Sequence, residues 1–253
     1  MSGAGAADMD VGAEAMGTLH LFERYYYTRA AFRDGTQTFH RLCRRYLRAG
    51  GKVLEIGAGP GNKTTKFLSG FVELVGVDVS DEVRSNGALA ARCLGDAGRL
   101  PFRDGAFDGC VSNYVVEHLS EPEAHLREVA RLLRPGGVYC FRTPNLWHYV
   151  TLASRLLPYR AHLKWANWLR ALDQAHDPYP TYYRMNTARA IRRAARRAGL
   201  DPVEMETIEA EPYYGRRHAL LFYPMMLYER LVNASPHLAG LRMNLLVVLA
   251  KTG

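Results

Sequence analysis

The stretch Lys52-Val-Leu-Glu-Ile-Gly-Ala-Gly-Pro-Gly61 decides the fold of this chain. A short apolar run at residues 52–56 leads into a turn with three glycines, and a helical pattern begins at Asn62. A strand, a glycine turn and a helix in this order are typical of open α/β sheets, which bind ligands at the carboxyl ends of their strands. Glycine permits the sharp turn and leaves no Cβ in the path of a ligand. The stretch therefore predicts a parallel sheet with a ligand site at residues 57–61.

Further strands follow the same alternation of apolar runs and helical stretches. Apolar runs at residues 72–77, 91–94, 107–112 and 137–142 predict four of them. A strand near 203–210, a helical stretch near 217–232 and an apolar strand at 245–250 close the pattern. A terminal pair of strands, one of them antiparallel, would complete the sheet. We predict an α/β, Rossmann-like fold with a seven-stranded, mostly parallel sheet and helices on both faces.

Helices are predicted most firmly where apolar residues repeat at helical spacing. Leu126, Val129, Ala130 and Leu133 follow an i, i+3, i+4, i+7 pattern, which gives one buried face. Residues 18–48 are expected to form two helical pieces that break near Asp34-Gly35, and another helix is expected at about 187–198.

The chain divides into a tail, a core and an insert. Residues 1–17 are rich in glycine and alanine and are expected to form a flexible N-terminal tail without a secretory signal. We interpret residues 18–253 as a single domain, with a cofactor-binding core at 50–144. The alternation breaks at about 145–185, which hold all three tryptophans and five tyrosines. This stretch is predicted to be a helical and aromatic cap over the substrate.

Composition limits the possible partners and compartments. The formal net charge of +8 would favour an anionic partner, although an arginine-rich composition also follows from a GC-rich genome. No apolar run reaches the roughly 18 residues needed to span a membrane, so no membrane span is expected. The four cysteines form no C-x-x-C pair, which argues against a metal site and favours a cytoplasmic location.

Acidic residues follow the second and third predicted strands. Asp78 ends the second strand, where an acid can accept bonds from both hydroxyls of a ribose. Asp96, in Gly95-Asp96-Ala97, follows the third strand, where a second acid can accept a bond from an adenine amino group. The glycine turn and Asp78 alone would also suit an enzyme that binds a dinucleotide.

Three later motifs distinguish these possibilities. They are Leu100-Pro-Phe102, Ser112-Asn-Tyr-Val-Val-Glu-His-Leu119 and Leu132-Leu-Arg-Pro-Gly-Gly137. With them in this order, residues 50–145 resemble the class I S-adenosylmethionine-dependent methyltransferases, in the small-molecule branch called type 11. Glu55 stands where the family more often has aspartate. The resemblance implies S-adenosylmethionine as the cofactor.

The resemblance also assigns expected roles to the residues of the first motif. The backbone around the glycine turn would line the methionine and ribose path of the cofactor, at Gly57, Ala58, Gly59 and Gly61. Glu55 would orient this loop or reach the methionine ammonium through water.

Roles at the following strand ends are carried over in the same way. Asp78 would hold the ribose and Val79 would pack on the adenine. Asp96 and Ala97 would contact the adenine edge. The end of the fourth strand would lie near the methionine part and the sulfonium, through Asn113 and Tyr114.

Methyl transfer is an in-line displacement at a carbon that positive sulfur already activates. The protein must align the reacting atoms and exclude water. If the acceptor is a hydroxyl, a histidine is the usual general base. The candidates are His148, which we prefer because it follows the fifth strand, and His118 and His176. A packing role is the competing interpretation for each.

Aromatic residues beside the predicted site are candidates for substrate contact. Tyr25 lies in the first helical piece, and Trp147, Tyr182 and Tyr183 lie in the cap. They would line an apolar pocket, or the cap residues would form a small core of their own.

Two further surfaces leave alternatives open. Five arginines between residues 189 and 197 share one helix face, which could bind phosphate or an acidic protein, or be simply solvated. The apolar stretch 220–228 could contact a lipid-like substrate or a second subunit, or pack against the cap.

The leading prediction is O-methylation of a small bacterial metabolite, with that small molecule as the partner and a homodimer as an option. An RNA methyltransferase is favoured only by charge, and nucleic acid is not expected because no Asn-Pro-Pro-aromatic motif follows the fourth strand. A dehydrogenase predicts G-x-G-x-x-G, whereas the glycines here have a shorter spacing. A non-catalytic cofactor-binding or scaffold protein is the alternative of another class.

Overall fold

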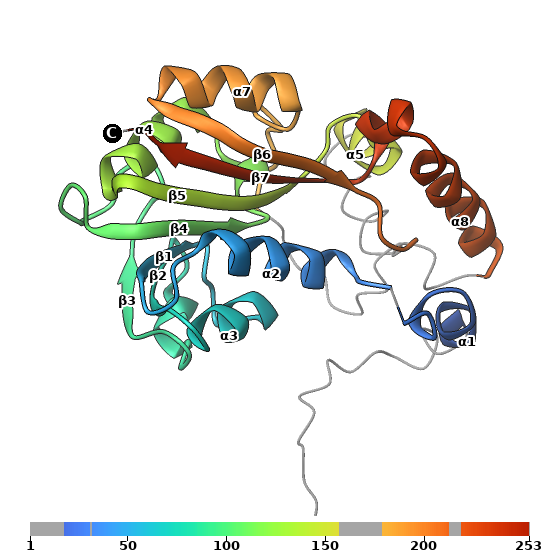
Figure 1. The fold of residues 1–253 in the computed structure, drawn as a ribbon, viewed down its shortest axis with the longest axis horizontal. Helices are drawn as coiled ribbons and strands as arrows, with labels where there is room; N and C mark the ends of the chain where they lie inside the picture. The colour runs from blue at the N-terminus through green and yellow to red at the C-terminus, as the bar shows by residue number, and fades with distance from the viewer. Residues whose placement is uncertain (1–17, 31, 157–178, 213–218, 253) are drawn as a thin grey trace, which may run out of the picture.

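One sheet of seven strands organises the molecule (Figure 1). The computed structural model describes residues 18–30, 32–156, 179–212 and 219–252. The strands are β1 (Lys52–Ile56), β2 (Glu73–Asp78), β3 (Ala91–Leu94), β4 (Phe107–Asn113), β5 (Leu133–Pro144), β6 (Leu200–Ile208) and β7 (Asn244–Lys251). Their order is β3-β2-β1-β4-β5-β7-β6. β7 runs antiparallel to both of its neighbours and the first five strands are parallel, so the predicted sheet is confirmed.

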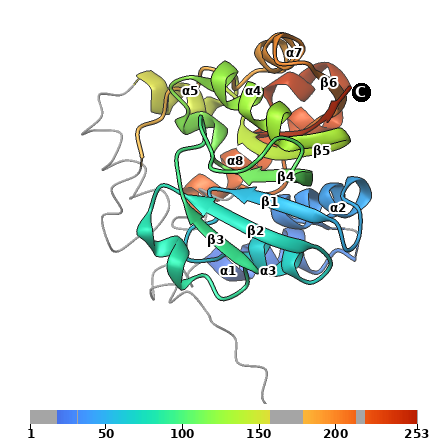
Figure 2. The same ribbon diagram turned by 90° about the vertical axis from the view of Figure 1, so that its left-hand side faces the viewer.

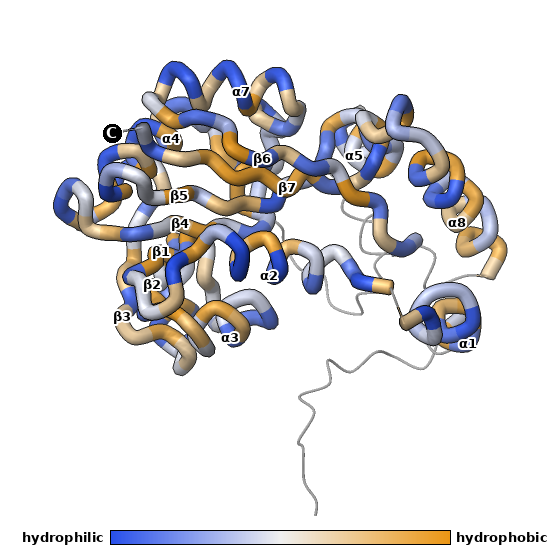
Figure 3. Tube along the Cα trace, in the orientation of Figure 1, coloured by the Kyte–Doolittle hydropathy of each residue, from blue (hydrophilic) through white to orange (hydrophobic). Residues whose placement is uncertain are grey.

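Helices cover both faces of this sheet, as Figures 1 and 2 show. α4 (Pro122–Leu132) and α7 (Ala188–Arg197) lie on one face, and α2 (Gly35–Tyr46) and α3 (Lys63–Ser69) lie on the other. Side chains alternate between the two faces along each strand. Leu54 joins the core under α4 and α7, whereas its neighbour Val53 joins the core under α2 and α3. Because both faces are covered, the central strands are apolar along most of their length (Figure 3).

Strand β5 begins earlier than the sequence pattern predicted. Leu133 was expected to complete the apolar face of the preceding helix, but α4 ends at Leu132. Leu133 instead pairs with Phe107, and the register then shifts before Val138 pairs with Gly109. Pro135 lacks a backbone donor and Gly136 has a φ of 76°, which account for the irregular ladder between these pairs.

Two segments far apart in the sequence meet beyond the carboxyl ends of the parallel strands. They are the N-terminal α1 (Leu19–Phe22) with the π-helix η2 (Glu23–Tyr27), and α8 (Ala219–Ala234). The rings of Phe22 and Phe222 lie 5.0 Å apart, and the Tyr26 hydroxyl donates to Glu229 Oε2 at 2.9 Å. α5 (Tyr149–Leu156) and η6 (Pro236–Leu241) lie at the same end of the molecule. These segments therefore flank the edge where a ligand is expected.

Two features are absent from the described ranges. Among those residues, no helix is both long and apolar enough to cross a membrane. The same residues contain no cluster of three potential metal-binding side chains. The predicted tail at 1–17, and most of the predicted cap, lie outside the described residues. The division into core and cap therefore stays a prediction.

Candidate functional site

The glycine turn lies at the switch point of the sheet, where β1 is flanked by β2 on one side and β4 on the other. Gly57, Gly59 and Gly61 have φ values of 76°, 49° and 108°, a region that side chains with a Cβ rarely adopt. The Gly57 and Ala58 amides donate to the Val77 carbonyl at 2.8 and 3.2 Å. The turn is thereby folded across the end of β2.

Gly57 also makes a close approach that excludes larger residues. A Cβ at this position would lie 2.3 Å from Val115 Cγ2, well inside the contact distance of two carbon atoms. The segment that follows β4 therefore packs directly on the backbone of the turn.

We expect Gly57→Ala to lower the free energy of unfolding by about 2–5 kcal/mol, the sum of left-handed strain and overpacking. Gly136→Ala is the matched control, because Gly136 also has a φ of 76° but a Cβ there would meet nothing within 4 Å. The control should cost only about 1–2 kcal/mol. Urea unfolding of both variants measures the difference, and equal losses would show that the contact with Val115 has no cost.

The Asp78 carboxylate joins the turn to the end of β2. Its Oδ2 accepts a bond from the Gly59 amide at 2.9 Å, and its Oδ1 accepts one from the Ser80 amide at 2.8 Å. Each carboxylate oxygen has capacity for a further bond. The next residue, Val79, exposes 54% of its surface and offers an apolar face beside the carboxylate.

Asn86 holds the same turn from the other side, and the sequence interpretation missed it. Its side chain is buried, and Nδ2 donates to the carbonyls of Ala58 and Gly59 at 3.3 and 3.2 Å. Asn86 follows η3 (Asp81–Ser85), outside the predicted motifs. No local pattern in the sequence indicates this contact.

Glu55 is the residue that best tests whether a cationic ligand fits. It is buried beneath the turn, and its Oε1 accepts a bond from the Thr65 hydroxyl at 3.1 Å. Its Oε2 is equally buried and has no hydrogen-bond partner among the residues that the structure describes. Burial raises the pKa of this carboxyl to about 7. A buried oxygen without a donor is costly, so the site suits a ligand that brings a donor or a positive charge.

The end of β4 presents Asn113 and Tyr114. Tyr114 has a φ of 59°, which is uncommon for a residue with a side chain and is found most often at functional sites. Its hydroxyl donates to Asn244 Oδ1 at 3.0 Å. Arg142, at the end of β5, donates from Nε to Asn113 Oδ1 at 2.7 Å and lies over the Tyr114 ring at 4.5 Å. This buried arginine positions both residues, and the sequence interpretation did not single it out.

A buried chain of hydrogen bonds supports the loop at Asp96 and Ala97. His125 is fully buried, and burial lowers its pKa, so the ring is neutral. Its Nδ1–H donates to the Ala97 carbonyl at 2.9 Å, and its Nε2 therefore accepts from the Tyr139 hydroxyl at 3.0 Å. Tyr139 in turn accepts from Ser112 at 2.6 Å. The loop is thus tied to the centre of β4.

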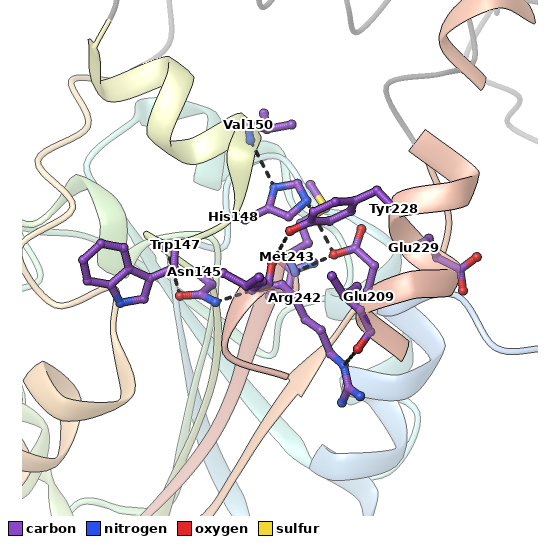
Figure 4. Close-up of polar contacts among 12 residues, drawn as sticks. Asn145, Trp147, His148, Val150, Glu209, Tyr228, Glu229, Arg242 and Met243 are labelled. Atoms are coloured by element: carbon purple, nitrogen blue, oxygen red, sulfur yellow. Dashed lines mark hydrogen bonds and ion pairs between the residues drawn. The ribbon is translucent and has the colours of Figure 1, made fainter. Parts of the chain in front are cut away.

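His148, the preferred base of the sequence analysis, lies in a buried contact network that Figure 4 shows. Its Nδ1 accepts a bond from the Val150 amide at 3.3 Å, which places the proton on Nε2. That nitrogen lies 3.5 Å from Glu209 Oε2, and Glu209 also accepts from the Met243 amide at 2.7 Å. These contacts join the start of α5 to the residue that precedes β7. They leave His148 no basic nitrogen directed at a ligand.

His118 has the opposite arrangement. Its Nδ1 lies 3.0 Å from the Pro180 carbonyl, which can only accept, so the proton is on Nδ1 and the lone pair is on Nε2. The residue ends η4 (Val116–His118), directly after the strand end at Tyr114, and is partly exposed. The third candidate, His176, lies outside the described residues.

The candidate substrate residues are dispersed around this edge. Trp147 exposes 55% of its surface and points away from the network around His148 (Figure 4). The Tyr182 and Tyr183 amides both donate to the Glu117 carbonyl, which brings them next to His118. Tyr25 instead packs on Phe222 of α8, with ring centroids 5.9 Å apart. The structure thus places two of the four candidates near His118.

Comparison with known proteins gives consistent results. Residues 54–141 match the family model described as "Methyltransferase domain". The chain is 33% identical over 142 residues to a protein named demethylmenaquinone methyltransferase from Mycolicibacterium vanbaalenii, a match that covers 53% of this chain and 62% of the relative. The chain therefore spans less than two thirds of the length of this relative.

Solved structures resemble the whole described fold. A methyltransferase of Haloferax volcanii, solved in complex with the Trm112 methyltransferase activator, has a TM-score of 0.58 at 20% identity, over 85% of this chain and 88% of that chain. The cyclase SpnF has a TM-score of 0.57 at 16% identity, over 90% of this chain and 86% of that chain. Likenesses at this identity establish the fold alone, and a cyclase among them illustrates that the fold does not fix the reaction.

Proposed function

Residues 54–141 belong to a class I S-adenosylmethionine-dependent methyltransferase domain, and from this premise we propose that the chain methylates a small organic acceptor. The observation that carries the proposal is the buried Glu55 Oε2 beneath the glycine turn, which has no hydrogen-bond partner among the described residues and is close enough to Asp78 for their charges to interact. A cofactor with an ammonium group and a ribose supplies partners for both acids. A dinucleotide carries no ammonium group that could donate hydrogen bonds to Glu55.

Each residue at the switch point would bind a different part of the cofactor. S-adenosylmethionine, when bound, supplies a methyl group on a positively charged sulfur. Glu55 would pair with the ammonium, and Asp78 would accept bonds from the ribose hydroxyls. Val79 would cover one face of the adenine beside Asp96 and Ala97. Asn113 and Tyr114, held by Arg142, would border the reacting carbon and exclude water.

His118 is the general base that we propose, in place of His148. The Pro180 carbonyl fixes the proton of His118 on Nδ1, so Nε2 is the basic nitrogen of this ring, whereas the Nε2 of His148 carries the proton. With this base, we propose methylation at oxygen of a small bacterial metabolite. The name of the relatives makes a quinol ring the second acceptor class, and the same base would ionise its hydroxyl.

Turnover is tested by release of S-adenosylhomocysteine with panels of phenols, quinols and aliphatic alcohols. We expect release with at least one hydroxylated panel and none without acceptor. NAD binding in place of S-adenosylmethionine binding, measured by calorimetry, would contradict the proposal.

RNA is a third acceptor class, favoured by one observation. Along α7, the side chains of Arg189, Arg192, Arg193 and Arg196 are exposed and make no hydrogen bond or ion pair with other residues of the described ranges, so they form a row of uncompensated charge. Total RNA therefore belongs among the acceptors in the same assay. Release with RNA alone would replace the small-molecule proposal.

A homodimer remains part of the proposal. Phe222 of α8 is buried against α1, whereas Leu220, Leu227 and Leu231 expose 88%, 69% and 58% of their surface. Exposed leucines of this kind often mark contact surfaces. Light scattering coupled to size exclusion measures the state directly, and a Leu227→Gln, Leu231→Gln variant should be monomeric.

Binding of S-adenosylmethionine is expected to weaken as the pH falls through about 7. Glu55 must be ionised to pair with the ammonium, and its raised pKa means that protonation competes with binding below that value. The affinity should fall up to about tenfold for each pH unit in the acid range and be highest above about pH 7, until the ammonium group of the cofactor itself loses its proton. Calorimetry across this range checks it. Glu55→Gln should bind weakly at every pH, and a slope retained in that variant would assign the effect to another group.

A further inference from the structure

A second cavity lies next to the candidate cofactor site and is lined by none of its residues. It has a volume of about 730 Å³ and lies between residues 27–30 and 32–33 on one side and α2 and α3 on the other. Four arginines line it, Arg29, Arg33, Arg41 and Arg44. The volume is within the range of small-molecule sites, roughly 300–1,000 Å³.

The positive charge of this cavity is compensated only in part by the described residues. Within the described part of the chain, no hydrogen bond or ion pair occupies the guanidinium of Arg29 or Arg41. Arg33 donates only to backbone carbonyls, at 3.0 and 2.6 Å. Arg44 lies over the ring of Phe71 at 4.4 Å.

One carboxylate lines the cavity, and it already has a structural role. Asp34 Oδ1 accepts a bond from the Gln37 amide at 2.7 Å and caps α2. The neighbouring His40 adds no charge near neutral pH, because burial and the charge of Arg142 lower its pKa. Four arginines against one acid attract an anion, and guanidinium groups match the oxygens of phosphate in geometry as well as charge.

Aromatic rings form the remaining wall. Phe67 of α3 stacks on His40 with a centroid distance of 4.3 Å and an interplanar angle of 1°. Phe32 packs edge-on against the Tyr26 ring, with centroids 5.6 Å apart. Rings held in this way give a fixed apolar surface on which a flat group can lie. The cavity therefore combines sites for an anion and for a ring.

The side chain of Thr64 contacts both a residue that lines the cavity and a residue of the candidate cofactor site. Thr64 Oγ1 accepts a bond from Asn113 Nδ2 at 3.3 Å and lies 3.2 Å from His40 Nε2. The wall of the cavity is thus in contact with the residue at the end of β4, while the glycine turn and Asp78 take no part in it.

We propose that this cavity binds a phosphate ester that carries a planar ring, at the same time as the cofactor site is occupied. The arginines hold the phosphate and the wall of Phe32 and Phe67 holds the ring. The proposal does not depend on the methyl transfer proposed above, because the two sets of lining residues are separate.

Calorimetric titration of the full chain with phenyl phosphate, inorganic phosphate and phenol tests the proposal at physiological ionic strength. We expect phenyl phosphate to bind most tightly, inorganic phosphate more weakly and phenol least. Arg29→Gln with Arg41→Gln should weaken phenyl phosphate binding by about tenfold or more, since a hydrogen bond to a charged group contributes about 1.5–3 kcal/mol. Both side chains are exposed, so the variant should fold.

The matched control is Arg192→Gln with Arg193→Gln on α7, which removes the same charge elsewhere and should leave binding unchanged. An equal loss of affinity for phenyl phosphate in both variants would show that the effect comes from net charge alone, and it would overturn the proposal. Displacement of phenyl phosphate by saturating S-adenosylmethionine would place the anion in the cofactor site and overturn it as well. So would the absence of binding at millimolar phenyl phosphate.

Discussion

Replacing Asp78 with alanine is expected to weaken S-adenosylmethionine binding by about a hundredfold or more. The carboxylate would accept two hydrogen bonds from the ribose, and each bond to a charged group contributes about 1.5–3 kcal/mol. The change also releases the Gly59 amide from Oδ2, so the turn loses its link to the end of β2. Isothermal titration calorimetry of the variant measures the effect, with circular dichroism to verify that the sheet is intact.

Asp81→Ala is the control for this experiment. Asp81 lies three residues further along the chain, and its exposed side chain pairs only with Arg84 among the described residues. Its loss removes the same charge but no contact with the turn, so affinity should stay within about twofold of wild type. An unchanged affinity in the Asp78 variant would show that this carboxylate does not bind the ribose. Asp78→Asn, which keeps one oxygen for the Gly59 amide, separates collapse of the turn from loss of the ribose contact.

Replacing His118 with asparagine is expected to lower kcat by about a hundredfold or more, the usual contribution of a general base. Asparagine can still donate from its amide to the Pro180 carbonyl, so the contact with the segment before Tyr182 is retained. It offers no group that can take a proton near neutral pH. Binding of S-adenosylmethionine should be unaffected, because the change acts on the acceptor alone.

His148→Gln separates catalysis from packing in the same assay. This change disturbs the contact with Glu209 and is expected to lower the melting temperature more than kcat. Steady-state rates with a hydroxylated acceptor, together with thermal melts, check both statements. If the His148 variant loses turnover and the His118 variant does not, the assignment of the base is reversed.

The sheet and the position of the cofactor turn could be predicted because their signals are local. The apolar run at 52–56, the three glycines and the acid at Asp78 all lie within one strand-turn-helix-strand unit. Sheet edges were less predictable. β6 begins at Leu200, before the expected residue 203, because its early residues pair with the far end of β7, a contact between distant segments.

The supporting residues of the site could not be predicted for the same reason. Asn86, His125 and Arg142 hold the turn, the loop at Asp96 and the end of β4 through hydrogen bonds to residues about 28 positions away in sequence. The choice between the candidate histidines could not be made from the sequence either. Which ring nitrogen is basic depends on the backbone partner of the other nitrogen, which is the Val150 amide for His148 and the Pro180 carbonyl for His118. Composition and residue spacing do not predict these partners.

The position of β7 inside the sheet constrains the order in which the chain can fold during synthesis. β6 leaves the ribosome first, yet its partner in the sheet is β7, which lies between β6 and β5. Until residues 244–251 emerge, β6 has no strand to pair with and the apolar edge of β5 is open to other chains. The cofactor half of the sheet, from β3 to β5, can assemble earlier. A ribosome stalled before residue 244 would therefore hold a chain with a formed glycine turn and an unprotected edge.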